Sequence, residues 1–132
     1  MENVTLALKI HDFECSIEAI NKKLGIDATE SWLKGEIIPN RDGSITRKNS
    51  SWIIKSSIEN SEFINQGIDD LLMSINENEL LAFSHKYLCE LSIVMKCRNE
   101  NNIGLNFNKE VIKKLSSLGI ELDVDIYMLS NV

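Results

Sequence analysis

Residues 102–128 read NIGLNFNKEVIKKLSSLGIELDVDIYM, and this stretch decides the fold. Apolar residues alternate with polar ones at both of its ends, which predicts one strand over 102–107 and another over 120–127. Between them the apolar residues recur at helical spacing, so residues 108–118 are predicted to form a helix that Gly119 ends. The stretch therefore predicts a strand, a helix and a strand that share a single buried side.

The last predicted strand has two chemically different sides. Leu122, Val124 and Ile126 are expected to point into the core, where burial of each side chain contributes about 1.5–3 kcal/mol. Leu122→Asp is therefore expected to unfold the domain. The residues between them are acidic: Glu121, Asp123 and Asp125. This acidic row indicates a sheet face in contact with water, and it would also protect a strand edge from pairing with other chains.

The rest of the chain repeats the same two patterns. Strands are predicted at 4–10, 51–57 and 88–97, helices at 17–24, 60–75 and 76–84, and a short hairpin within the turn-rich segment 27–47. This order predicts an α+β fold, with a sheet whose helices pack on one face, in the manner of a ferredoxin-like sandwich with an extra hairpin. Because no linker interrupts the 132 residues, we expect a single domain over 1–132.

Composition narrows the possible partners. The net charge of −6 argues against nucleic acid or an anionic membrane and favours a basic protein surface, or simply solubility. The chain starts without a basic and apolar leader, and no apolar run approaches the roughly 20 residues that a membrane helix needs. Three cysteines are an odd number, and none is required for folding at this length. We expect a cytoplasmic protein.

Catalytic and metal-binding motifs are missing from the sequence. His11 and His85 are the only imidazoles, and neither lies in a recognisable motif. His11 lies near Glu14 and Cys15, but no second Cys or His pair completes a tetrahedral metal site. We therefore expect no enzyme activity, no metal and no cofactor, and we interpret His11 as an ordinary residue at a strand end.

The charged residues are unevenly distributed. Between Lys55 and Lys86 there is no Lys or Arg, so acids on the predicted helices lack the basic neighbours that usually support an exposed helix. This indicates either a solvated surface or a docking face for a cationic protein. The candidate partner-binding residues are Glu59, Glu62, Asp69, Asp70, Glu77 and Glu79.

One region is basic and aromatic, with Trp32 and Trp52 among Arg41, Arg47, Lys48 and Lys55. It is weak evidence for nucleic-acid binding, because the protein is acidic and no binding motif is present. Core packing for Trp52 and a loop anchor for Trp32 are the preferred interpretations.

Short motifs lie along nearly the whole chain: Leu24-Gly25-Ile26, Thr29-x-Ser31, Lys34-Gly35-Glu36, Trp52-x-Ile54-x-Ser56, Leu118-Gly119-Ile120 and Asp123-x-Asp125-x-Tyr127. With them the sequence resembles an uncharacterised bacterial family, the domain of unknown function 4279. The resemblance implies a small cytoplasmic protein without an assigned activity, and some members resemble immunity proteins encoded beside secreted toxins. It transfers no catalytic residue. The resemblance leaves two interpretations open for the motif residues between 29 and 36 and for Trp52: they form a structural turn, or they contact a ligand.

Two functions follow as hypotheses. The first is a cytoplasmic immunity protein that neutralises a toxin domain, a basic nuclease in particular, through the acidic surface. The second is a small-molecule-binding regulatory domain with its ligand near residues 29–36 and Trp52.

Overall fold

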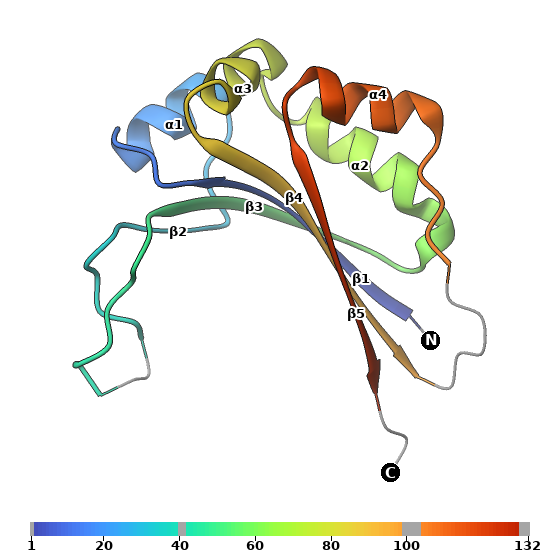
Figure 1. Ribbon diagram of the computed structural model, residues 1–132, viewed down its shortest axis with the longest axis horizontal. Coiled ribbons are helices and arrows are strands. Elements are labelled where there is room, and N and C mark those ends of the chain that lie inside the picture. Colours follow the sequence, from blue (N-terminus) through green and yellow to red (C-terminus); the bar gives the residue numbers. More distant parts are fainter. Residues whose placement is uncertain (1, 40–41, 99–103, 130–132) are drawn as a thin grey trace.

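The structure is a computed structural model that describes residues 2–39, 42–98 and 104–129 (Figure 1). Its strands form one sheet in the order β2-β3-β1-β4-β5. Their bounds are β1 Glu2–His11, β2 Glu30–Trp32, β3 Ser51–Ile58, β4 Leu88–Arg98 and β5 Glu121–Leu129. The helices lie together on one face of this sheet: α1 Ile17–Leu24, α2 Ile64–Met73, α3 Glu77–Ser84 and α4 Lys109–Ser117.

The connectivity confirms the predicted fold class. Strand β1 lies between β3 and β4 and is antiparallel to both, while β2 pairs antiparallel with β3. With α1 after β1 and α2 and α3 before β4, this is the βαββαβ arrangement of a ferredoxin-like sandwich. Helix α4 then returns the chain so that β5 pairs parallel with β4. The extra hairpin is also present, with a bridge between Ile37 and Thr46.

Short polar side chains begin α1, α3 and α4. Ser16, Asn76 and Asn108 each accept a hydrogen bond from the backbone N–H three residues later, at 3.1, 3.2 and 2.9 Å. Gly25 ends α1 in the left-handed conformation, with φ of 79°. These caps fix where α1, α3 and α4 start, and Gly25 fixes where α1 stops.

The predicted strand over 102–107 is wrong for the residues that the structure describes. Residues 104–107 are irregular, and positions 102 and 103 lie outside the described part of the chain. The cause is Asn65 on α2, whose Nδ2 donates to the Asn106 carbonyl at 2.7 Å and whose Oδ1 accepts from the Asn108 N–H at 3.0 Å. Backbone groups in this segment therefore bind a helix side chain, while Leu105 and Phe107 pack half-buried on the core.

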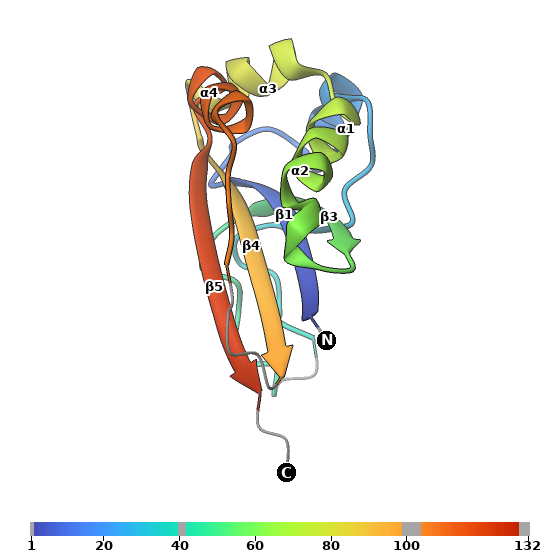
Figure 2. The ribbon, with the colours of Figure 1, turned by 90° about the vertical axis from the view of Figure 1, so that its right-hand side faces the viewer.

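The predicted burial of the last strand is also wrong. Leu122, Val124 and Ile126 are 41%, 36% and 46% exposed. Strand β5 lies at the edge of the sheet, and its second half extends beyond the helical layer (Figure 2). These side chains are only partly covered, so Leu122→Asp is no longer expected to unfold the protein.

Candidate functional site

The six candidate carboxylates do not form one cluster. Glu62 and Asp70 are exposed at the start and on the outer side of α2, with Asp69 half-buried beside them. On α3, Glu77 forms an ion pair with Lys114 of α4 at 2.8 Å, so its charge is neutralised by a base distant in sequence. Glu79 borders a hollow that Lys23 and Lys86 also line. Among the described residues, Glu77 is the one of these six carboxylates with an ion pair, and Glu62, Asp69 and Asp70 are the three that lie together on α2 and the turn before it.

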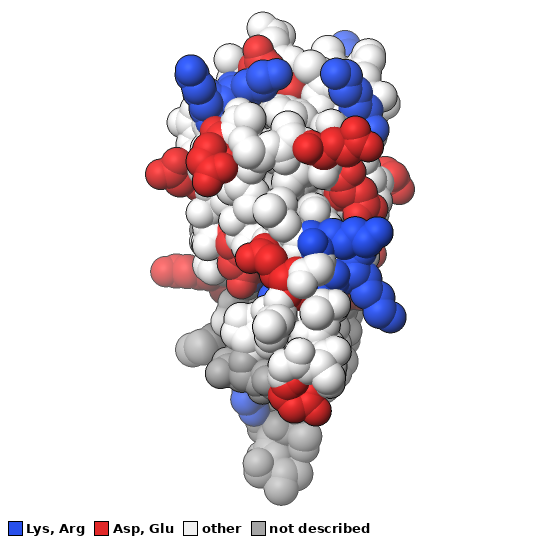
Figure 3. All heavy atoms as spheres, turned by 90° about the vertical axis from the view of Figure 1, so that its left-hand side faces the viewer, with Lys and Arg blue, Asp and Glu red and all other residues white. Residues whose placement is uncertain are grey.

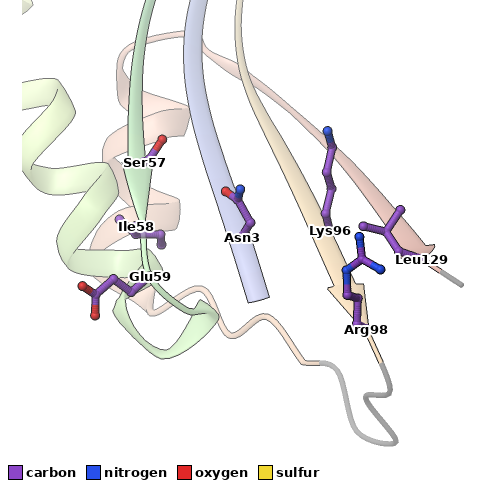
Figure 4. Close-up of a pocket in the computed structure, with 7 residues that line it drawn as sticks. All are labelled: Asn3, Ser57, Ile58, Glu59, Lys96, Arg98 and Leu129. Atoms are coloured by element: carbon purple, nitrogen blue, oxygen red, sulfur yellow. The ribbon is translucent and has the colours of Figure 1, made fainter. Parts of the chain in front are cut away.

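Glu59 belongs to a different surface. It follows β3 and borders a hollow of about 460 Å³ whose other side carries Lys96, Arg98 and Leu129 (Figure 4). Cationic side chains thus lie across this hollow from Glu59, and the residue is not part of the α2 group.

The outer side of α2 also carries large apolar residues, which the sequence analysis missed. Phe63, at the end of the 3-10 turn Ser61–Phe63, is 49% exposed, and Met73, at the end of α2, is 74% exposed. Gln66 and Asp70 lie between them at helical spacing, and Gln66 Nε2 donates to Asp70 Oδ1 at 2.8 Å. We call Glu62, Phe63, Gln66, Asp69, Asp70 and Met73 the α2 face. Apolar side chains at both ends, with carboxylates between them, distinguish it from an ordinary solvated helix.

Charge is mixed elsewhere on the molecule. On the side formed by α1 and the segment 33–50, Lys and Arg alternate with Asp and Glu, and neither sign dominates (Figure 3). The net charge of −6 is therefore not a uniform field over the whole surface.

A cleft of about 440 Å³ lies between the hairpin, the end of strand β1 and the start of strand β3. Its lining includes His11, Trp32, Arg47 and Lys48. The Arg47 guanidinium lies 3.8 Å from the centre of the Trp32 ring, a cation–π contact that holds the arginine over the cleft. The prediction of Trp32 as a loop anchor is confirmed by this contact.

His11 lies at the base of this cleft within a chain of hydrogen bonds. Its Nε2 is 2.8 Å from Glu90 Oε1, and its Nδ1 is 2.9 Å from Ser51 Oγ. A neutral imidazole that donates to the Glu90 carboxylate accepts the Ser51 hydroxyl at its other nitrogen. This order of groups resembles a nucleophile, a base and an orienting acid. Ser51 is only 3% exposed, and the hydrogen bonds join the end of β1 to the first residues of β3 and β4.

The motif residues near Thr29 make contacts that hold the local structure. Thr29 Oγ1 accepts from the Lys55 N–H at 3.0 Å, and the Glu36 carboxylate accepts from the Leu33 N–H. Trp52 is fully buried, and its Nε1 donates to Asn21 Oδ1 at 2.7 Å. The prediction of core packing for Trp52 is confirmed, and these contacts support the structural-turn interpretation of the motifs.

The thiols do not form a reactive or metal-binding group. Cys89 and Cys97 are buried and Cys15 is half-buried. Burial raises the pKa of the Cys89 thiol to about 12, so it stays protonated at neutral pH. Within the described residues no three His, Cys, Asp or Glu side chains gather in a way that could hold a metal ion. Of the helices in the same part of the chain, none has the length and apolar character that crossing a bilayer requires.

The geometry defines a class of α+β proteins: a ferredoxin-like sandwich extended by a helix and a fifth, parallel strand. The family model described as "Domain of unknown function (DUF4279)" matches residues 2–129, and the chain belongs to this family. No curated protein and no solved structure matches the chain. Family membership therefore assigns no activity, and any function must be argued from the surfaces described above.

Proposed function

We propose that this protein is a cytoplasmic bacterial immunity protein, which binds a basic toxin domain through the α2 face and so neutralises it. The observation that carries the proposal is the α2 face itself, where the exposed carboxylate of Asp70 lies between the exposed side chains of Phe63 and Met73 and the exposed carboxylate of Glu62 lies directly before Phe63. A nuclease is the favoured toxin class, because its substrate site attracts phosphates and carboxylates compete for the same cations.

The two kinds of residue on this face would have different roles in binding. Carboxylates without basic neighbours attract a cationic partner over a distance and raise the association rate. Aromatic and methionine side chains are enriched in interface cores, where their burial slows dissociation. Phe63 and Met73 are ten residues apart, about 15 Å along a helix, which suits one side of an interface burying about 800 Å² per partner.

The test compares charge reversal on the α2 face with the same change elsewhere. The probe is the toxin domain encoded next to this gene, and its binding is followed by stopped-flow fluorescence or surface plasmon resonance. Glu62→Lys/Asp70→Lys should slow association about tenfold and reduce its salt dependence, because the steering charge is removed. The control Glu14→Lys/Asp27→Lys changes the net charge equally at exposed positions outside this face. Equal on-rates for the two variants would contradict the proposal.

The cleft beside the hairpin, with Arg47 and Lys48 in its lining, supports a second candidate, a regulatory domain that binds a small anion. Arg47, stacked on Trp32, retains guanidinium N–H donors that suit a carboxylate or phosphate, and Lys48 adds a second positive charge. Titration with inorganic phosphate should then quench tryptophan fluorescence in a saturable manner. Trp32→Phe or Arg47→Ala should abolish the response, while Lys55→Ala should leave it intact. A linear, non-saturating response would exclude this function for phosphate.

A further inference from the structure

Strand β5 leaves one edge of the sheet open. It pairs with β4 from Glu121 to Leu129, and no strand in the described part of the chain pairs with its other side. All nine of its residues are exposed. The large apolar ones, between 36% and 56% exposed, are Leu122, Val124, Ile126, Tyr127, Met128 and Leu129. A long, apolar and open edge is a template for pairing with another strand.

The side of β5 that faces the helical layer is apolar along its whole length. Leu122, Val124, Ile126 and Met128 lie in register with the buried residues Leu91, Ile93, Met95 and Cys97 of β4. The buried row of the sheet thus continues onto β5, where its residues are only partly covered. A second apolar strand beside β5 would extend this row.

The opposite side of β5 is electrically asymmetric. Glu121, Asp123 and Asp125 occupy the first half of the strand, and Tyr127 and Leu129 follow in the second half. On β4, Lys96 is the register partner of Tyr127, and Arg98 is the partner of Leu129. Figure 4 shows Lys96 and Arg98 at this end of the sheet. The β4–β5 edge is therefore negative where β5 starts and positive where it ends.

We infer that β5 is a homodimerisation edge, which pairs antiparallel with β5 of a second copy about a twofold axis at Ile126. An edge with opposite charges at its two ends is complementary to itself when reversed, and two identical strands related by a twofold axis meet in this way. The result is a continuous sheet across both copies. This inference is independent of the proposed function, because the α2 face contributes no residue to β5.

The charges favour a twofold axis at Ile126 over one at Val124. With Ile126 opposite its own copy, Asp125 faces Tyr127 of the partner subunit and Asp123 faces Leu129 of the partner subunit. The partner's Lys96 lies on β4, one strand beyond the partner's Tyr127, and is therefore about 9–10 Å from the β5 backbone of the first copy. A lysine and an aspartate side chain together span this distance, so the partner's Lys96 can reach Asp125. A twofold axis at Val124 would instead set Asp123 against Asp125, and like charges directly opposite are destabilising.

Sedimentation equilibrium on the full chain tests the dimer. Ile126→Lys places two like charges on the twofold axis and should raise the dimer dissociation constant about tenfold or more. The control Ile112→Lys makes the same change at an exposed residue of α4 and should leave the constant unchanged. A wild-type chain that is monomeric at about 100 μM, an affinity too weak for a stable dimer, would overturn the inference. So would equal constants for the two variants.

Cross-linking tests the register, and it remains informative if Ile126→Lys fails to fold. In a Cys15→Ser background, Ile126→Cys should form a disulfide-linked dimer under mild oxidation, since residues opposite each other in an antiparallel pair have Cβ atoms about 4.5–5.5 Å apart. Leu122→Cys lies away from the axis and should remain monomeric on a denaturing gel. Equal cross-linking of both variants would contradict the pairing.

Discussion

Leu91→Ala should lower the free energy of unfolding by about 2–5 kcal/mol, whereas Leu122→Ala should lower it by less than about 1 kcal/mol. The two leucines are register partners on the same side of neighbouring strands. Leu91 is fully buried, so its truncation leaves a cavity, while Leu122 is 41% exposed and its site is open to water. The difference in the free energy of unfolding between the two variants therefore measures how much more the helical layer buries Leu91 than Leu122.

Urea unfolding followed by circular dichroism measures both values. Samples are compared at one protein concentration, because dimerisation would add a concentration-dependent contribution. Leu91→Ala is expected to remove a large part of the 5–15 kcal/mol that stabilises a typical domain. Similar losses for the two variants would show that Leu122 is covered in solution, and would contradict the open edge at β5.

The same leucine pair shows what a sequence pattern can and cannot predict. Alternation correctly identifies β5 as a strand and correctly places Leu122, Val124 and Ile126 on one side. Whether that side is buried depends on which elements pack over it, and this follows from strand order and helix position in space. The acidic row of Glu121, Asp123 and Asp125 is compatible with an edge strand but does not fix the strand order, and an edge strand with an apolar side has the same alternation as a central one.

Contacts between residues far apart in the sequence explain the other differences between prediction and structure. The contacts of Asn65 with residues 106 and 108 replace strand pairing, although more than 40 residues separate Asn65 from this segment. His11 binds Ser51 and Glu90, which are 40 and 79 residues away, so no motif spacing could have indicated this network. Local features were predictable for the opposite reason. Capping residues such as Ser16 bond within a single helical turn.

The candidate docking face was predicted only in part. An acidic stretch is visible in sequence, but proximity along the chain did not keep Glu77 with the α2 acids, because Lys114 of α4 pairs with it. The apolar members of the face, Phe63 and Met73, were not singled out from the sequence, and only their exposure in the structure identifies them. The spacing of Phe63, Asp70 and Met73 around the helix was the one signal that could have grouped them.

Gly67→Leu should lower the free energy of unfolding by about 3 kcal/mol or more, through overpacking between α2 and the sheet. Gly67 is buried on the inner side of α2, and a Cβ atom there would lie 2.9 Å from Ile58 Cγ2 and 3.0 Å from Leu6 Cδ1. Leucine has a higher helix propensity than glycine, worth about 0.8–1 kcal/mol at an interior position. Any loss of stability therefore comes from steric conflict with the sheet and not from the helix itself.

Two further variants test whether the loss of stability in Gly67→Leu comes from steric conflict with the sheet. Gln66→Leu adds the same side chain at the neighbouring, exposed position of α2 and should change stability by less than about 1 kcal/mol. Ile58→Ala removes the atoms that approach Gly67 most closely, so Gly67→Leu/Ile58→Ala should lose less stability than the sum of the two single changes. A Gly67→Leu protein as stable as the wild type would mean that α2 stands further from β1 and β3 than these distances state. In that case the position of the α2 face relative to the sheet would also change, and the docking proposal would lose its geometric basis.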